Sequence, residues 1–512
     1  MSIYQNDPSL GWGVVQKFGG TSVGKFPDKI AHDIVRASLS KNRVVVVCSA
    51  RSTGKKAEGT TSRLLAVYEK LRAVSKASAT DDEQQGLIQQ ANGLILEICN
   101  DHIFAAETFV SDEKLRQALV ERLKNECQEI IEYIVAAKRF NLEINARSKD
   151  RVISFGEKLS CLFMTTLLHN LGVEAEYIDL SDAFHAGANT RVDQAFFDTA
   201  GAVFAKKIAA CENRVPVVTG FFGNVPGSLM EGDIGRGYTD LCASLCAVGL
   251  GAQELQIWKE VDGIFTADPS KVPTACLLSS ITPSEAAELT FYGSEVIHHL
   301  TMDQVIHAKP PIPIRIKNVN NPRGNGTLVV PKPRRASVNG NGVVNGGSSP
   351  GSPRSRKPRR PTAVTIKDRI SVLNIHSNKR SISHGFFAKV FSILNDNRIS
   401  VDLISTSEVY VSLAIHSGGL DSDHLKKAQK LLEEIGEVTI HPNMAILSLV
   451  GADMKQMTGI AGRMFSVLGD HQINLEMISQ GASEINISCV VEASEATRAM
   501  NVLHTHLFTF LD

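Results

Sequence analysis

A glycine loop bounded by two lysines is the part of this chain best suited to phosphate chemistry. The loop reads KFGGTSVGK from Lys17 to Lys25 and follows a short apolar run. Gly19, Gly24 and Lys25 fit the G-x-x-x-x-G-K spacing of a P-loop, but Phe26 stands where that motif carries the hydroxyl that holds Mg²⁺. Lys17 lies near the end of the preceding strand. This placement suggests a different cradle, in which the lysine and backbone N–H groups face the transferred phosphoryl group.

Further polar or glycine-rich segments stand where predicted strands should end. Open parallel sheets bind ligands at the carboxyl ends of their strands, so these segments are expected to converge on one site. They are CSARSTG (48–54), TTS (60–62), RVISFGE (151–157), IGRGYTD (234–240) and WKEVDGIFTADP (258–269).

These segments differ in how well a purely structural role explains them. Capping of a helix explains residues 60–62 about as well as substrate contact does. Glu157 is expected in the first turn of a helix, where the helix dipole alone would account for it. Arg236 and Asp240 are better functional candidates, because they occupy a glycine-rich loop at a helix start. Residues 262–263 (Asp-Gly) predict a tight turn after a strand.

Hydrophobic patterning indicates the elements that position these residues. Short β-branched runs alternate with amphipathic helical patterns from about residue 14 to residue 330, with strands expected at 14–17, 44–48, 175–178, 215–219, 255–259 and 312–317. This alternation predicts an α/β fold with a largely parallel sheet covered by helices on both faces. Residues 62–140 lack convincing strands and are interpreted as a helical insertion.

Composition limits the class of protein. A chain of 512 residues predicts about two to four domains. The formal net charge is zero, so the overall charge does not point to nucleic acid or a membrane surface. The nine cysteines lack metal-ligand spacing, which fits a reducing compartment. We find neither a leader-like segment nor an apolar run of membrane-spanning length, and expect a cytoplasmic protein without a metal site of its own.

The composition changes abruptly at residues 332–361. This segment is rich in Gly, Ser, Pro, Asn and Arg and contains no acidic residue, which predicts a disordered linker. Its basic clusters are compatible with a localisation signal, and RRAS at 334–337 is compatible with phosphorylation at Ser337. A solvated spacer is the favoured interpretation.

An internal repeat follows the linker. Residues 391–405 align without gaps on residues 465–479, and Gly385 and Gly459 keep the same offset of 74. Each copy reads as a helix, a polar turn and an alternating strand, followed by a further strand. The pattern predicts two small α+β modules, whose paired interface is suited to a small ligand.

Taken in order, these motifs resemble those of the aspartate kinases in the amino acid kinase family. KFGGTSVG, SFGE, GRG-x-x-D, VDGI-F-T-ADP and IPI-x-IKN occur in the family order, and the repeat resembles the tandem ACT domains that regulate such enzymes. The resemblance covers nearly the whole chain and looks most like the fungal branch. It implies an amino acid kinase domain at 11–331, the linker at 332–361 and ACT (βαββαβ) modules at 362–440 and 441–512, with the strand at 362–369 joining the second ACT sheet.

The resemblance implies transfer of the γ-phosphoryl group of ATP to the β-carboxylate of L-aspartate, giving 4-phospho-L-aspartate. A carboxylate is already ionised at pH 7, so positioning and charge neutralisation are the remaining tasks. Lys17 would stabilise the transferred phosphoryl group, and Asp240 would orient Lys17. Glu157 would pair with the substrate ammonium, and Arg236 would clamp the α-carboxylate.

The other implied contacts fall into three groups. Ser49 and Thr61 would line the aspartate pocket. The ATP side would consist of Gly19, Gly20, Thr21, Lys259, Asp262, Phe265, Lys271 and Lys317, with Mg²⁺ carried mainly by the ATP phosphates. An amino-acid effector would be bound by Ser383, Gly385, Asp402, Thr406 and Glu408.

The same resemblance implies a regulated enzyme at the first step of the threonine and methionine pathway. Threonine is favoured over lysine as the effector. ACT pairs usually complete their sheets across a two-fold axis, so a homodimer or a higher even homo-oligomer is expected.

The chain departs from the family pattern at a few positions. Tyr238 replaces a glycine in the GRG loop. Ser270 stands where a basic residue often follows the ADP segment, and Asn320 stands where some members carry a lysine. Lys271 or Lys317 is expected to substitute for these missing cations.

Two other functions stay open. Another carboxylate kinase of the same superfamily, such as a glutamate kinase, would share the loop chemistry, but the tandem ACT modules argue against it. A catalytically inactive amino-acid sensor would keep the fold. The joint presence of four functional side chains argues against the inactive sensor: Lys17, Glu157, Arg236 and Asp240.

Overall fold

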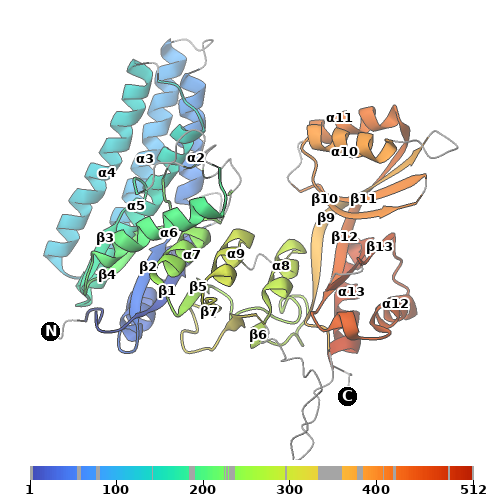
Figure 1. Cartoon of the computed structure of the whole chain (residues 1–512). Helices are drawn as coiled ribbons and strands as arrows, with labels where there is room; N and C mark the ends of the chain where they lie inside the picture. The colour runs from blue at the N-terminus through green and yellow to red at the C-terminus, as the bar shows by residue number, and fades with distance from the viewer. Residues whose placement is uncertain are drawn as a thin grey trace, which may run out of the picture. The chain divides into compact units, whose positions relative to one another are not determined.

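The computed structural model forms two compact units. It describes residues 4–54, 59–75, 81–140, 142–183, 191–223, 225, 229, 234, 237–293, 297–331, 360–377, 385–407, 409–418, 422–481 and 485–509. The N-terminal unit comprises Met1–Ile264 and Ile297–Val330, and the C-terminal unit comprises Phe265–Val296 and Pro331–Asp512 (Figure 1). Most of the predicted linker, with Ser337, lies outside the described residues.

A largely parallel sheet forms the centre of the N-terminal unit. Its strands are β1 (Trp12–Phe18), β2 (Arg43–Cys48), β3 (Ala175–Ile178), β4 (Val215–Thr219), β5 (Glu254–Lys259), β7 (Ile314–Asn318) and β8 (Thr327–Val329). They run in the order β3-β4-β2-β1-β5-β7-β8, and β7 and β8 pair antiparallel. Strand β2 is a run of valines that is fully buried, as expected where helices cover both faces of a sheet. The predicted α/β fold is confirmed.

Helices surround this sheet and extend from it as a bundle (Figure 1). They are α1 (Gly20–Lys25), η1 (Lys29–Arg36), α2 (Thr60–Val74), α3 (Asp81–Phe109), α4 (Glu113–Arg139), α5 (Ala146–Asn170), α6 (Gln194–Ala209), α7 (Tyr238–Leu250) and α9 (His299–His307). Helices α2, α3, α4 and α5 pack along one another through a continuous apolar core. Helix α5 also contacts β3 and β4, so one end of the bundle is anchored on the sheet.

Helix α5 begins earlier than the sequence pattern indicated. Asn145 caps the helix by accepting hydrogen bonds from the backbone N–H groups of Arg147 and Ser148. Glu157 therefore lies in the middle of the helix and not in its first turn. The predicted position is wrong because the helical periodicity continues through the polar stretch before Glu157. The helix dipole does not explain a carboxylate so far from the helix start.

The repeat builds an antiparallel sheet in the C-terminal unit. The elements of this unit are β6 (Ser280–Ile281), α8 (Pro283–Phe291), β9 (Ala363–Ser377), α10 (Phe386–Asp396), β10 (Val401–Thr406), β11 (Tyr410–His416), α11 (Ser422–Glu433), β12 (Gly436–Val450), η3 (Met454–Gln456), α12 (Ile460–Asp470), β13 (Met477–Ser479), β14 (Asn486–Glu492), α13 (Ala493–His504) and η4 (Thr505–Thr509). The strand order is β10-β11-β9-β12-β14-β13. Gly385 and Gly459 precede α10 and α12 with φ values of +88° and +80°, which are accessible to glycine.

The long strand β9 serves both copies of the repeat. Its second half, from Ile370 to Ser377, pairs with β11 and with the first part of β12. Its first half, from Ala363 to Lys367, pairs with the second part of β12, which in turn pairs with β14. One strand therefore contributes to the sheet regions of both modules.

Residues that precede the linker also belong to the C-terminal unit. The segment Phe265–Val296 packs there, and its helix α8 contacts β12. The Glu285 carboxylate accepts hydrogen bonds from the Thr362 hydroxyl at 2.6 Å and from the Ala452 backbone N–H at 2.8 Å. The change in composition places a domain boundary at the linker. The hydrogen bonds of Glu285 instead group residues 265–296 with the repeat that follows the linker.

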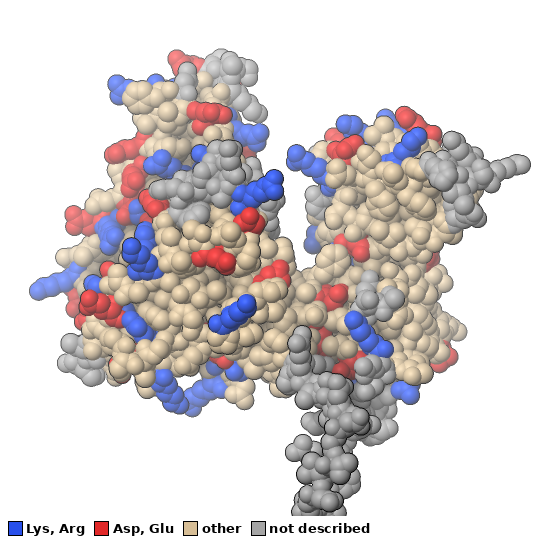
Figure 2. All heavy atoms as spheres, in the orientation of Figure 1, with Lys and Arg blue, Asp and Glu red and all other residues tan. Residues whose placement is uncertain are grey.

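Charges of both signs are interspersed on the face of the molecule shown in Figure 2, in keeping with a formal net charge of zero. Within the part of the chain that the structure describes, no helix combines the length and apolarity that crossing a membrane requires. The nine cysteines are unpaired, and all except Cys276 are buried. The buried thiols pack as small apolar groups.

Candidate active site

Lys17 and Asp240 form an ion pair near the carboxyl end of β1. The Lys17 Nζ and Asp240 Oδ1 atoms are 2.7 Å apart, and the two side chains are 13% and 12% exposed. Asp240 lies in the first turn of α7, which follows Gly237 with its φ of +96°. A Cβ at Gly237 would lie 2.8 Å from the His298 ring, so this helix start requires glycine. The ion pair fixes the position of the Lys17 ammonium. The N–H donors of this ammonium that do not face Asp240 can bind a ligand.

The Glu157 carboxylate is fully buried near this ion pair. The Thr239 hydroxyl donates a hydrogen bond to Oε1 at 3.0 Å and lies 3.5 Å from the Ser49 hydroxyl. Burial raises the pKa of Glu157 to about 7, and this rise is opposed by the Tyr238 and Thr239 hydroxyls, the Phe221 N–H and the neighbouring lysine ammonium. Oε2 has no hydrogen-bond partner of ordinary length among the described residues. A buried carboxylate with an available oxygen is suited to receive an ammonium group.

The start of helix α2 meets α5 beside this carboxylate. A Cβ at Gly156 would lie 3.0 Å from the Thr60 Cγ2 atom, so α5 and α2 approach closely next to Glu157. Thr61 is half-buried in the first turn of α2, and the N-cap position is occupied by Gly59 without a side-chain hydrogen bond. The hydroxyl groups in this turn therefore do not act as the N-cap.

The glycine loop packs its backbone against the segment after β2. A Cβ at Gly20 would lie 2.1 Å from the Ala50 carbonyl oxygen, and a Cβ at Gly24 would lie 2.1 Å from the Ser52 carbonyl oxygen. The Ser52 N–H donates a hydrogen bond back to the Gly20 carbonyl at 2.9 Å. These two glycines are needed for the close approach of two loops, whatever else the loop binds.

Gly19 keeps space open beside Lys17, the second-last residue of β1. The nearest atom to a Cβ at Gly19 would be the Lys17 Nζ, at 3.9 Å. Thr21 follows, half-buried in α1, whereas Lys25 is exposed in the last turn of that short helix. The buried and paired Lys17 is therefore better placed than Lys25 to act on a phosphoryl group in a protected site.

Gly24→Ala is expected to destabilise the fold. The added methyl group would collide with backbone, so the free energy of unfolding should fall by roughly 1–3 kcal/mol. The matched control is Gly93→Ala, at an exposed position in α3 with nothing within 4 Å of the new Cβ. Alanine there should stabilise the protein by about 0.5–1 kcal/mol. Urea denaturation measures both changes, and a Gly24→Ala chain as stable as the parent would contradict the close approach.

Strand register separates two lysines that were expected near ATP. Lys17 is opposite Ile257, and Lys259 follows two residues later on β5, so Lys17 and Lys259 project from the same face of the sheet. Lys317 is opposite Trp258, and its ammonium lies 4.9 Å from the centre of that ring. It projects from the other face, where burial lowers its pKa. The register thus favours Lys259 over Lys317 as a neighbour of Lys17.

The remaining ATP candidates have contacts within their own units. Asp262, in the N-terminal unit, accepts a hydrogen bond from the Asn318 side chain at 3.1 Å. Phe265 and Lys271 belong to the C-terminal unit. Lys271 forms a half-exposed ion pair there with Asp368, at 3.4 Å.

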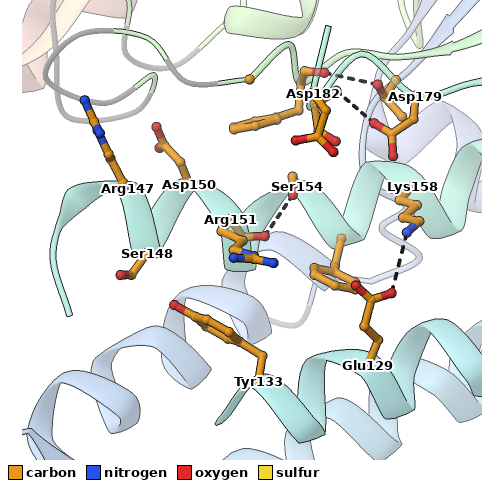
Figure 3. A pocket seen from close by; sticks show the side chains of 15 residues that line it. Glu129, Tyr133, Arg147, Ser148, Asp150, Arg151, Ser154, Lys158, Asp179 and Asp182 are labelled. Carbon is orange, nitrogen blue, oxygen red and sulfur yellow. Dashed lines mark hydrogen bonds and ion pairs between the residues drawn. The ribbon is translucent and has the colours of Figure 1, made fainter. Parts of the chain in front are cut away.

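A cavity of about 350 Å³ adjoins the site along helix α5. Side chains from α4 and α5 project toward it in Figure 3, among them Glu129, Tyr133, Arg151, Ser154 and Lys158. Arg151 lies over the Tyr133 ring, 5.0 Å from its centre, and Lys158 forms ion pairs with Glu126 and Glu129. Arg151 and Lys158 therefore already have partners, and Arg147 is a further cation that lines the cavity.

Several predicted residues lie outside the described part of the chain, and two others lie at the ends of elements. Arg236, Ser383 and Glu408 lie outside the described residues, and their contacts stay predictions. Gly385 precedes α10 with a positive φ, and Thr406 is exposed at the end of β10.

Asp402 is the effector candidate with the most defined surroundings. Its Oδ1 atom lies 2.8 Å from the Lys367 Nζ, and the Asp402 and Lys367 side chains are 5% and 18% exposed. The Lys367 ammonium also lies 4.6 Å from the centre of the Phe291 ring. Oδ2 of Asp402 is buried and has no hydrogen-bond partner among the described residues.

Sequence reasoning did not single out three residues that shape the site. Thr239 could have been noticed as a hydroxyl in the first helical turn, beside Asp240. The backbone N–H of Phe221 carries no side-chain signal at all. Glu260 accepts a hydrogen bond from the Ser22 hydroxyl at 2.7 Å and so connects the glycine loop to the end of β5.

Comparisons with known proteins agree with this arrangement. The amino acid kinase family model matches residues 13–318, and an ACT domain model matches residues 447–507. The chain is 54% identical to aspartate kinase FUB3 of Gibberella moniliformis, over 97% of this chain and 98% of that protein. It is 49% identical to the aspartokinase of Schizosaccharomyces pombe, over 98% of this chain and 94% of that protein.

Solved aspartokinase structures share the fold. Escherichia coli aspartokinase III in complex with lysine and aspartate matches with a TM-score of 0.70 and 27% identity, over 97% of this chain and 99% of that chain. The same enzyme in complex with aspartate and ADP matches with a TM-score of 0.66 and 26% identity, over 97% of this chain and 100% of that chain. Because the family model spans most of the chain and the fungal relatives match nearly all of it, the chain belongs to the amino acid kinase family, and within that family to the aspartokinases.

Proposed function

We propose that this chain transfers the γ-phosphoryl group of ATP to the β-carboxylate of L-aspartate, giving 4-phospho-L-aspartate and ADP. The observation that carries the proposal is the Lys17–Asp240 ion pair beside the buried Glu157 carboxylate with its available oxygen. The fungal relatives, and the E. coli enzyme solved with aspartate and ADP, support the same substrates.

The reaction requires charge neutralisation more than proton transfer. A β-carboxylate oxygen forms the new bond to phosphorus while the bond from phosphorus to the β,γ-bridging oxygen breaks, and no proton has to be removed from the nucleophile. Lys17 neutralises charge on the transferred phosphoryl group, and Asp240 holds the Lys17 ammonium in position. Glu157 receives the substrate ammonium, while Ser49 and Thr61 border the same pocket.

The nucleotide occupies the side of the site nearest the glycine loop. In this proposal Gly19, Gly20 and Thr21 approach the phosphates, and Gly19 leaves room beside Lys17. Lys259 and Asp262 contribute from the end of β5 and the turn after it. The ATP contacts of Phe265 and Lys271 stay predictions, and Lys317 lies on the opposite face of the sheet from Lys17. Arg236 clamps the substrate α-carboxylate. Mg²⁺ enters with ATP as part of the nucleotide substrate, carried by its phosphates.

A hydroxamate assay tests this proposal. The full chain is incubated with ATP, Mg²⁺, aspartate and hydroxylamine, which traps an acyl phosphate as a hydroxamate. We expect product only when both ATP and aspartate are present, and little product when glutamate replaces aspartate. An absence of aspartyl hydroxamate would overturn the proposal in favour of an inactive amino-acid sensor. Equal product from glutamate would favour a broader carboxylate kinase.

We further propose that the C-terminal unit binds an amino-acid effector, with threonine favoured over lysine. The tandem repeat supports this, and so does the buried Asp402 with an available Oδ2, which is suited to an ammonium group. Gly385 begins the helix of the same module, and Ser383, Thr406 and Glu408 complete the proposed site. The E. coli enzyme solved with lysine and aspartate supports an amino acid as the class of ligand.

Asp402→Asn is expected to weaken threonine inhibition by roughly 30-fold, because asparagine keeps the shape but cannot pair with an ammonium. The rate without effector should stay within about twofold of the parent. The matched control is Glu476→Gln, which changes the exposed repeat-related position at the offset of 74. Inhibition constants for threonine and lysine measure the effect. Unchanged threonine inhibition would contradict the role of Asp402, and inhibition by lysine alone would contradict the choice of effector.

We also place the reaction at the start of threonine and methionine synthesis, in the cytoplasm. Nine unpaired cysteines favour a reducing compartment. The tandem modules favour an even homo-oligomer, which light scattering of the purified chain would detect.

A further inference from the structure

His298 packs against the loop that leads into α7. The residue is the N-cap of α9, and its carbonyl accepts hydrogen bonds from the Thr301 and Met302 backbone N–H groups. Its side chain is half-buried, and Nε2 lies 3.1 Å from the Ile234 carbonyl oxygen. A carbonyl oxygen can only accept, so Nε2 carries a proton and donates it. The imidazole therefore joins the start of α9 to the loop before α7.

The same ring packs against Gly237 at the start of α7. A Cβ at Gly237 would lie 2.8 Å from the imidazole Cδ2 and 3.0 Å from Cγ, so the ring fills the space that a side chain there would need. The Gly237 carbonyl accepts hydrogen bonds from the Asp240 N–H at 2.9 Å and from the Leu241 N–H at 3.2 Å. His298 thus packs on the N-cap residue whose carbonyl closes the first turn of α7.

That first turn carries two side chains of the candidate active site. The Asp240 carboxylate lies 2.7 Å from the Lys17 Nζ atom, and the Thr239 hydroxyl donates to Glu157 at 3.0 Å. Because both side chains belong to one turn, a shift of the turn would move both relative to their partners. A displacement of about 1 Å in a catalytic group can cost roughly 10²-fold in rate. The position of the helix start is therefore under tight constraint.

The imidazole of His298 is neutral near pH 7. Burial lowers its pKa and His299 acts in the same direction, against the smaller opposing effects of the Asp240 carboxylate and the hydrogen bond to Ile234. In the neutral ring Nδ1 carries no proton, and this buried atom has no hydrogen-bond partner among the described residues. One N–H at the position of Nε2 is therefore the hydrogen-bonding group that residue 298 must supply.

We propose that His298 is a positioning residue for phosphoryl transfer: it braces the start of α7, so that Asp240 holds the Lys17 ammonium in place for the transferred phosphoryl group. The inference rests on the proposed function, because it assumes that Lys17 acts on that group. His298 acts through Gly237 and Asp240 and not on the substrate itself. Loss of the brace should lower kcat, because the position of the ammonium matters most in the transition state.

The test compares glutamine with asparagine at position 298 of the full chain, through kcat for hydroxamate formation at saturating aspartate and Mg·ATP. Glutamine can place its amide nitrogen near the position of Nε2, whereas the shorter asparagine reaches only the position of Nδ1. His298→Gln should keep kcat within about threefold of the parent, and His298→Asn should lower it by roughly 10-fold. His299→Asn, at the exposed neighbouring position, is the matched control and should stay within about twofold.

A double-mutant cycle separates positioning from a general loss of structure. Asp240→Asn removes the charge through which His298 is proposed to act, so adding His298→Asn to it should lower kcat by less than about a further twofold. Circular dichroism establishes that each variant is folded at the assay temperature. Unchanged kcat in His298→Asn, or a further tenfold loss in the Asp240→Asn background, would overturn the inference.

The glutamine variant keeps the test decisive if asparagine unfolds the chain. A folded His298→Gln chain that loses about tenfold in kcat would also overturn the inference, because its donor is retained. A parent chain that forms no aspartyl hydroxamate would instead overturn the proposed function, and the inference with it.

Discussion

Replacing Lys17 with methionine is expected to lower kcat for hydroxamate formation by about 10³-fold. Methionine keeps a long flexible stem but removes the ammonium that Asp240 holds at 2.7 Å. No other described side chain forms an ion pair with Asp240, so the charge on the transferred phosphoryl group would lose its best-placed partner. The KM for aspartate should change far less than kcat, because the lost interaction belongs to the transition state.

The matched control for this prediction is Lys25→Met. Lys25 fits the spacing of a P-loop lysine but is exposed at the end of α1, so the variant should keep its rate within about twofold. An inactive Lys25→Met chain beside an active Lys17→Met chain would restore the P-loop interpretation. Removing the ammonium also leaves Asp240 buried without a partner, which should lower thermal stability. A Lys17→Met, Asp240→Asn double variant should recover stability without recovering catalysis, which separates the two effects.

Glu157→Gln is expected to raise the KM for aspartate by about 10²-fold, because glutamine fits the same space without the charge that pairs with the substrate ammonium. The KM for ATP should change little. Glu132→Gln, at an exposed position on α4, serves as the control and should have no effect. Steady-state kinetics with varied aspartate measure the change, and an unchanged KM in Glu157→Gln would contradict the assigned role.

The pH dependence gives this prediction a second readout. Burial raises the pKa of Glu157 to about 7, so the parent should lose kcat/KM for aspartate as the pH falls through about 7, and Glu157→Gln should lack this decline. The contribution of Glu157 to the free energy of unfolding changes with pH in the opposite direction. The folded state binds the proton more tightly than the unfolded state, so stability from this group is present at low pH and lost as the pH rises toward 7. At pH 8 the glutamine variant should therefore be at least as stable as the parent.

Much of the fold could be predicted because its signals are local. Runs such as 44–48 are entirely β-branched and apolar up to the cysteine, and a strand buried on both faces needs that composition. The matching residues at 391–405 and 465–479 predict two similar modules from sequence alone. The start of α5 was missed because residues 146–156 mix polar and apolar side chains, although Asn145 caps the helix there and α5 packs against α2 and α4.

The sequence by itself determined which residue types stand at the strand ends, and it nominated Lys17, Glu157 and Asp240 through their place in motifs. Tertiary structure alone decided how they act together. It buries Glu157 and so raises its pKa, and it places the Thr239 hydroxyl 3.0 Å from that carboxylate. It also places Lys317 on the opposite sheet face from Lys17. The physical reason is that burial, register and charge proximity arise from segments far apart in the chain, whereas motif and periodicity report only on neighbours in sequence.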